Sequence, residues 1–364
     1  MDDLYLWSCY GEQSFMEYVF PMGSTRFRFL YYLAAWLELA LVGTHINWIV
    51  PINILLNGLL AFYLYYLGRR LAGRSLPGFL AGILFLLSRM SYYQIGQMYG
   101  LMETMALWMA VGILWCLYRY LNDKKEKIWY FHWACWLYLG ICFVHERYMA
   151  LLPLFYLVLG LRRRFELRKW LWPAAAFAVV QVVRFFTIGT LSPAGTGGTQ
   201  VADTFSVFAA IKYALSQVAY IFGINAGPEH LNGIAWGDVP FRIKLLVYGA
   251  DAVLLAFVCG FLAVVIRDKE RRGRCLSNAA LFLTFIALCI GSSSVTVRVE
   301  MRWVYVSYAA ALLFLAYICG VLAPPARQAE EPFMPFKRFG LGDGARREMK
   351  TVSMQQAGDS AEAN

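Results

Sequence analysis

The sequence predicts an all-α fold, that of a polytopic integral membrane protein with about nine transmembrane helices. Two observations lead to this class. Hydrophobic residues fill 60% of the 364 positions and charged residues only 15%, against roughly 25% charged in an ordinary soluble domain. The apolar residues also form runs close to the ~20 residues that an α-helix needs to cross the ~30 Å hydrocarbon core of a bilayer. Lipid is therefore the expected solvent for most of the chain.

The apolar runs define the predicted spans, although some only just reach the required length. We place them at Ile46 to Leu67, Pro77 to Tyr93, Leu101 to Leu121, Ile128 to Val144, Tyr148 to Leu161, Trp170 to Ile188, Leu245 to Ile266, Cys275 to Ser293 and Arg302 to Ala323. Trp and Tyr residues at the ends of several runs fit rings placed at the membrane interfaces.

Two further apolar segments are expected to lie at the outer surface instead of spanning. Phe27 to Gly43 contains Glu38 and is followed at once by a longer run, so it is predicted to be an interfacial helix. Val207 to Gly223 follows a Gly-rich loop and is predicted to be a re-entrant or surface helix. Counting it as a span would move the basic cluster Arg267 to Arg274 to the outside.

The orientation follows from the basic residues, because Lys and Arg concentrate in short cytoplasmic loops. Most of the 33 basic residues fall in alternate loops and in the C-terminal tail, including Arg69, Arg70, Arg74, Arg119, Lys124, Lys125, Lys127, Arg162, Arg163, Arg164, Arg168, Lys169 and the Arg267 to Arg274 cluster. An odd number of spans then places the N-terminus outside a cell (plasma) membrane and the C-terminus in the cytoplasm. Residues 1–323 form the predicted transmembrane domain, and the polar residues 324–364 are expected to be a disordered cytoplasmic tail.

Composition also bears on the partners and cofactors. The net charge of +10 comes from short basic clusters and not from one continuous stripe, so we expect anionic lipid and no nucleic acid as its partner. The eight Cys residues contain no CxxC pair and the four His residues are scattered, so neither a zinc site nor a disulfide framework is indicated. The cofactor stays unknown: a divalent metal is left open but has no positive indication. No Walker, HExxH, GxSxG or Rossmann motif is present.

Polar residues outside the basic loops gather on the predicted extracytoplasmic face. They are Asp2, Asp3, Arg26, Arg28, His45, Gln97, Glu103, His145, Glu146, Arg147, Arg298, Glu300 and Arg302. An acidic pair such as Asp2 and Asp3 can supply a general base together with a metal-binding or orienting group. From spacing alone, a solvated chain end is the better interpretation of that pair.

The turn His145-Glu146-Arg147 follows a predicted span too short to cross the whole membrane, so its charges are expected below the outer surface. Such charges are functional candidates by default. A structural Glu–Arg pair that closes a helical hairpin explains them equally well. Asp251 and Arg184, both inside predicted spans, are open to the same two interpretations.

The segment Arg298 to Trp303 alternates charged and apolar residues before the last span, so its two Arg residues and Glu300 are able to face one cavity. Arginine is the side chain best suited to bidentate phosphate binding. A belt of snorkelling side chains explains Arg302 and Trp303 but explains Glu300 less well.

Taken in chain order, these features resemble the C-type (GT-C) membrane glycosyltransferase superfamily, particularly its bacterial members. The resemblance covers most of Asp2 to Leu322, and its short motifs carry weight through their order and shared face. They are the acidic pair, the interfacial helix from Arg26, the span ending Leu67 to Gly73, the polar stretch leading to Glu103, the turn His145 to Tyr148, and Glu300 to Trp303.

This resemblance implies transfer of a sugar from a polyprenyl-phosphate donor to a glycan or lipid acceptor at the extracytoplasmic face. Asp2 or Asp3 would be the catalytic base, and Arg302, Arg298 or Arg147 would hold the donor phosphate. His45, Gln97, Glu103, His145, Glu146 and Glu300 are further candidates on that face.

The N-terminal acidic pair departs from the family pattern, in which a transmembrane helix precedes it. Here Met1 comes directly before Asp2, so the sequence is expected either to begin inside a longer protein or to lack that anchor. Two other functions stay open. One is a non-catalytic transporter with a polar pathway through Glu146, Arg147, Asp251 and Glu300. The other is a degenerate relative in cell-surface polysaccharide export that binds without chemistry.

Overall fold

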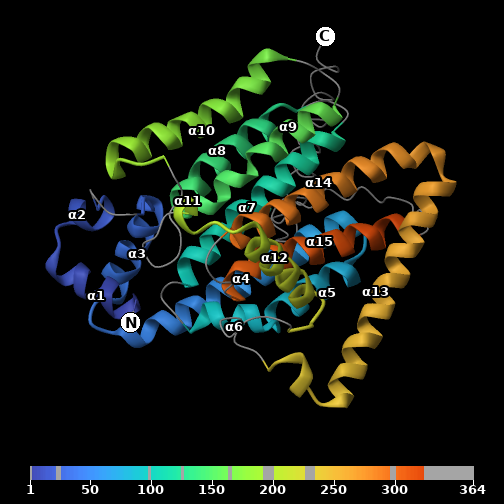
Figure 1. Cartoon of the computed structure of the whole chain (residues 1–364), viewed down its shortest axis with the longest axis horizontal. Coiled ribbons are helices and arrows are strands. Elements are labelled where there is room, and N and C mark those ends of the chain that lie inside the picture. The colour runs from blue at the N-terminus through green and yellow to red at the C-terminus, as the bar shows by residue number, and fades with distance from the viewer. Residues whose placement is uncertain are drawn as a thin grey trace, which may run out of the picture. The chain divides into compact units, whose positions relative to one another are not determined.

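A computed structural model describes residues 2–21, 26–96, 100–123, 127–162, 166–191, 201–225, 234–295 and 301–323. Within these ranges every regular element is a helix (Figure 1). The predicted tail 324–364 lies outside the described residues, as do Gln97, Arg298 and Glu300. The all-α class predicted from the sequence is therefore confirmed for the described part of the chain.

Six of the described helices are long and apolar enough to cross a membrane. They are α4 (Ile49–Ala72) with the short η1 (Ile46–Trp48) before it, α7 (Gly100–Asn122), α10 (Leu167–Ile188), α13 (Phe241–Arg267), α14 (Lys269–Ser294), and α15 (Tyr305–Leu322) with η6 (Met301–Val304) before it. Large apolar side chains lie on their outward faces, as Phe186 on α10 and Leu246 on α13 do. These helices indicate a multi-pass membrane protein, whose number of spans stays a prediction.

The shorter apolar helices complete the bundle. They are α3 (Phe29–Val42), α5 (Ser75–Leu86), α8 (Trp129–Val144), α9 (Leu152–Leu161) and α12 (Val207–Ile221). The α3 helix packs against α7 and α8, and α12 packs against α14 and η6. These two are the segments predicted at the outer surface, and their depth in a bilayer stays a prediction.

Several helix bounds differ from the predicted spans, each for a local reason. The run Pro77 to Tyr93 is divided into α5 and α6 (Arg89–Ile95), because Ser88 caps a new helix by accepting the Ser91 N–H. The run Tyr148 to Leu161 begins as a 3₁₀ helix, η2 (Glu146–Leu151), before α9. The basic cluster after α13 lies mostly in the first turns of α14, which Asp268 caps.

Glycine allows α4 and α5 to pack with their backbones in close approach. A Cβ atom at Gly78 would lie 2.5 Å from the Arg69 nitrogen and the Tyr65 oxygen, and one at Gly82 would lie 2.7 Å from the Ala61 oxygen. These two residues form a G-x-x-x-G sequence, the pattern that lets membrane helices gain packing energy where lipid removes the hydrophobic drive to associate.

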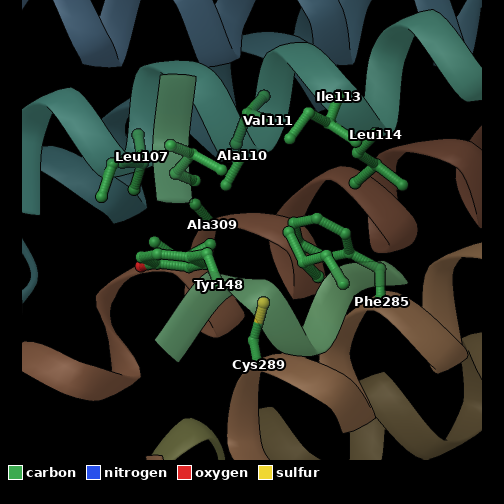
Figure 2. Packing of buried hydrophobic residues seen from close by; sticks show 14 of the residues in the cluster. Leu107, Ala110, Val111, Ile113, Leu114, Tyr148, Phe285, Cys289 and Ala309 are labelled. Carbon is green, nitrogen blue, oxygen red and sulfur yellow. The ribbon is translucent and has the colours of Figure 1, made fainter. Parts of the chain in front are cut away.

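The centre of the bundle is α7, which contacts α8, α14, α15 and α4. Figure 2 shows one buried face of α7 against residues of α14, α15 and η2; the labelled side chains are Leu107, Ala110, Val111, Ile113, Leu114, Tyr148, Phe285, Cys289 and Ala309. Tyr148 is only 2% exposed, so the turn that precedes α9 is anchored in this core. That anchor fixes the position of its neighbours Glu146 and Arg147.

Candidate functional site

The turn after α8 is the centre of the candidate site. His145 ends α8 in an extended conformation, with φ −152° and ψ 123°, and its Nδ1 accepts the Arg147 N–H at 3.4 Å. This local capping turns the chain sharply. The side chains of Glu146 and Arg147 consequently point to different neighbours.

Glu146 interacts with two other parts of the chain, the start of α3 and the end of α10. We call Arg28, Glu146 and Arg184 the Glu146 node. The Glu146 side chain is 2% exposed, and its Oε1 accepts the backbone N–H of Phe27 at 2.9 Å. Arg184 Nη1 on α10 lies 3.6 Å from Oε1, and Arg28 Nη2 lies 3.8 Å from Oε2. One carboxylate thus joins the start of α3, the turn after α8 and the end of α10.

Arg147 forms a separate buried ion pair with Glu103, in the first turn of α7. A helix N-terminus favours negative charge, which suits Glu103 to this position. Arg147 Nη2 also donates to the Tyr148 hydroxyl at 2.9 Å, and its guanidinium lies 4.9 Å from that ring's centroid. Arg147 Nη1 is buried and has no hydrogen-bond partner among the described residues.

The node and the pair together have more positive than negative charge. Three guanidiniums (Arg28, Arg147 and Arg184) face two carboxylates (Glu103 and Glu146) among the described residues. A buried donor without a partner is costly, so the Arg147 Nη1 position is suited to an anionic ligand. His145 adds no charge, because burial and the nearby guanidiniums of Arg28, Arg147 and Arg302 hold its pKa well below its usual value.

A cavity of about 480 Å³ opens beside these charges, and we call it the Arg147 cavity. Its polar lining comes from His145, Glu146, Arg147, Ser292, Ser293 and Trp303, and the rest of its lining is largely apolar. This volume lies in the range of ordinary ligand pockets, about 300–1,000 Å³.

The α14 wall of the cavity is tied to α12 by a buried amide. Gln217 donates from Nε2 to the Ser294 hydroxyl at 2.8 Å and accepts from the Ser293 hydroxyl at 2.7 Å. Because Ser293 also lines the Arg147 cavity, α12 helps to hold that wall in place.

Comparison with known proteins identifies no relative of this chain. No family model, no curated protein and no solved structure matches this chain. Function therefore has to be inferred from the chemistry of the site itself.

The structure brings together four of the residues predicted from the sequence: Glu103, His145, Glu146 and Arg147. Glu146 and Arg147 each form Glu–Arg ion pairs with other parts of the chain, Glu146 with Arg28 and Arg184 and Arg147 with Glu103. The choice between a structural and a functional role for the turn stays open. Arg184, for which the sequence left both a functional and a structural role open, belongs to the Glu146 node.

Other predicted site residues lie elsewhere or outside the described part. His45 is exposed at the start of η1 and lines neither this cavity nor the second one described below. Asp2 and Asp3 begin the helix α1 (Asp2–Glu12), but their side chains are outside the description, like the whole of Gln97, Arg298 and Glu300. Arg302 lies in η6, next to the cavity residue Trp303.

Two features of the site could not be assigned to it from the sequence. Arg28 was one of many outer-face charges, and nothing local connects it to Glu146, since Phe27 and Glu146 are 119 residues apart. Ser292 and Ser293 read as part of an apolar span. Within the described ranges, no group of three or more His, Cys, Asp or Glu residues is placed to hold a metal ion.

Proposed function

We propose that this chain is a membrane glycosyltransferase that moves a sugar from a polyprenyl-phosphate donor to a glycan or lipid acceptor at the extracytoplasmic face. The observation that supports it is the Arg147 guanidinium, which lines a cavity of about 480 Å³ and whose buried Nη1 has no hydrogen-bond partner among the described residues. A lipid phosphate in this cavity would accept the hydrogen bonds that Nη1 offers, and guanidinium groups bind phosphate with two parallel hydrogen bonds. The choice of sugar transfer as the reaction rests on the resemblance of the sequence to C-type glycosyltransferases.

In the proposed reaction the acceptor hydroxyl gives its proton to Asp2 or Asp3. The acceptor oxygen attacks the anomeric carbon, and the bond from that carbon to the phosphate oxygen breaks. The polyprenyl phosphate leaves with the bonding electrons, so the sugar is transferred with inversion. Arg147, with Arg298 or Arg302, would stabilise the charge that develops on the leaving phosphate.

The role of Glu103 in this proposal is to position Arg147. The ion pair holds Arg147 Nη2, which leaves Nη1 of the same guanidinium for the ligand. Preorganised donors of this kind stabilise developing charge without reorganising during the reaction.

Donor binding is tested with the protein in proteoliposomes and a radiolabelled sugar on polyprenyl phosphate. Arg147→Lys keeps a positive charge opposite Glu103 but loses the planar fork, so donor affinity is expected to fall about tenfold or more. Arg271→Lys is the control, because Arg271 is a half-exposed residue in a surface ion pair with Asp268. Equal donor affinity in wild type and Arg147→Lys refutes the phosphate site.

Transfer is tested separately from binding. The double variant Asp2→Asn, Asp3→Asn is expected to bind the donor normally and to release no polyprenyl phosphate. Undiminished transfer by the double variant refutes the catalytic assignment. Donor binding by the wild type without transfer to any acceptor would identify a binding protein and refute the enzyme.

A further inference from the structure

A second cavity, of about 360 Å³, lies among α6, the end of α12, the start of α13 and Tyr308 of α15. We call it the Trp236 cavity, after the residue in η5 (Trp236–Asp238) that forms part of its wall. Among the described residues it has no lining residue in common with the Arg147 cavity. It is therefore a separate compartment and not an extension of the proposed donor site.

The lining of the Trp236 cavity is mostly apolar. Its aliphatic and thioether side chains are Met90, Ile221, Ile234, Val239, Ile243 and Val247. The donors of Ser88, Asn225, Trp236 and Tyr308 in this lining are already used within the chain. They are therefore not free to bind the hydroxyl groups of a sugar, whereas a hydrocarbon chain packs against the aliphatic part of the wall.

The walls of this cavity are held in place without a ligand. Gly223 lies just after α12 with a φ of +77°, and a Cβ atom there would lie 3.3 Å from Val247 of α13. The backbone N–H of Trp236 donates to the Asn225 carbonyl at 3.0 Å, and its indole N–H donates to the Tyr248 hydroxyl at 3.2 Å. A preformed cavity lowers the ordering cost that a ligand has to overcome.

The rim of the cavity carries positive charge. Arg89 lines it, is exposed and has no ion pair with any described residue. Lys244 lies behind the wall, with its Nζ 6.0 Å from the Trp236 ring centroid and donating to the Gly237 carbonyl at 3.0 Å. One carboxylate, Asp238, is on the same short helix as Trp236.

The position of these cations along the helices needs an explanation. Arg89 follows α5, and Lys244 is in the first turns of α13, so both are at the helix ends opposite the basic loops at Arg69 to Arg74 and Arg267 to Arg274. The positive-inside rule accounts for basic residues in those loops but not for basic residues at the other end.

We propose that the Trp236 cavity binds an anionic membrane lipid, with one acyl chain against the apolar wall and the headgroup phosphate at Arg89. The apolar lining selects the chain, and the exposed guanidinium at the rim selects the charge of the headgroup. This site does not depend on the proposed glycosyltransferase function, because none of its described lining residues belongs to the Arg147 cavity.

The test is lipid retention, measured by native mass spectrometry on the full chain released from nanodiscs that contain equal amounts of phosphatidylglycerol and phosphatidylethanolamine. We expect wild type to retain phosphatidylglycerol in several-fold excess. Arg89→Gln is expected to lower that retention about tenfold, since a charge-assisted contact to phosphate is lost. Arg242→Gln is the matched control, because Arg242 is an exposed cation next to Ile243 that does not line the cavity.

A second variant tests the chain-binding part. Ile243 is 53% exposed at the cavity, so Ile243→Trp fills the space without disturbing a packed core and is expected to lower retention of both lipids. Equal retention of phosphatidylglycerol by wild type and Arg89→Gln overturns the proposal. Retention of phosphatidylethanolamine by the wild type as strong as that of phosphatidylglycerol overturns it as well.

Discussion

The buried ion pair between Arg147 and Glu103 makes a quantitative prediction about stability. Glu103 is 0% exposed and Arg147 is 8% exposed, so removal of one partner leaves a largely buried charge without its counter-ion. Breaking such a pair from one side costs about 3–5 kcal/mol. Arg147→Met additionally loses the hydrogen bond to Tyr148, which is worth about 1 kcal/mol.

A double variant distinguishes destabilisation by an unpaired charge from destabilisation by a general loss of packing. Glu103→Gln with Arg147→Met leaves no unpaired charge at either position, so it is expected to be less destabilised than either single variant. The free energy of unfolding is measured for the four proteins in mixed micelles with increasing sodium dodecyl sulfate.

A control comes from the surface pair of Arg271 and Asp268, at 3.2 Å, whose side chains are 52% and 35% exposed. Arg271→Met is expected to cost at most about 1 kcal/mol, because water and salt screen an exposed pair. If the double variant at Glu103 and Arg147 loses the sum of the two single effects, the charges are not coupled and the reasoning is refuted.

Three further predictions concern packing, pH and the link between α12 and α14. Gly78→Ala is expected to destabilise the protein by several kcal/mol, because its methyl group would meet backbone at 2.5 Å, whereas Gly58→Ala, with nothing within 4 Å, should be neutral or stabilising in thermal melts. The pKa of His145 is depressed in the folded state, so the neutral His145 side chain should make its full contribution to the free energy of unfolding above about pH 6.5. Below that pH the free energy of unfolding should fall by up to about 1.4 kcal/mol per pH unit. His145→Asn, which keeps an acceptor for the Arg147 N–H, should lose that part of the slope, and an unchanged slope contradicts the assignment. Gln217→Leu should cost about 1–3 kcal/mol by leaving the hydroxyls of Ser293 and Ser294 without their amide partner, and a cost near zero would show that α12 is held by other contacts.

The membrane class and most helices follow from local composition, because any run of about 20 apolar residues has to be a helix in lipid. The interruption at Leu87 and Ser88 was not predicted, since a single capping hydroxyl decides it within an otherwise continuous apolar run. Hydropathy measures average character and does not register one side-chain hydrogen bond.

The site shows a different limit of sequence reasoning. The turn His145 to Arg147 was found because charges in an apolar context stand out, but its partners could not be assigned. Several Arg residues were equally available to Glu146, and helix packing selects Arg28 and Arg184. The assignments of Asp2, Asp3, Arg298 and Glu300 stay predictions.

The Glu146 node also constrains the order in which the chain assembles during its synthesis. Phe27 and Glu146 are 119 residues apart, which at about 5–20 residues per second is a delay of roughly 6–24 s. Until the α8–η2 turn emerges, Arg28 and the Phe27 N–H have no Glu146 to bind, and their polar groups have to stay hydrated. The α3 segment leaves the ribosome before α8 and α10, and it can therefore reach its final place only after these later helices have been made.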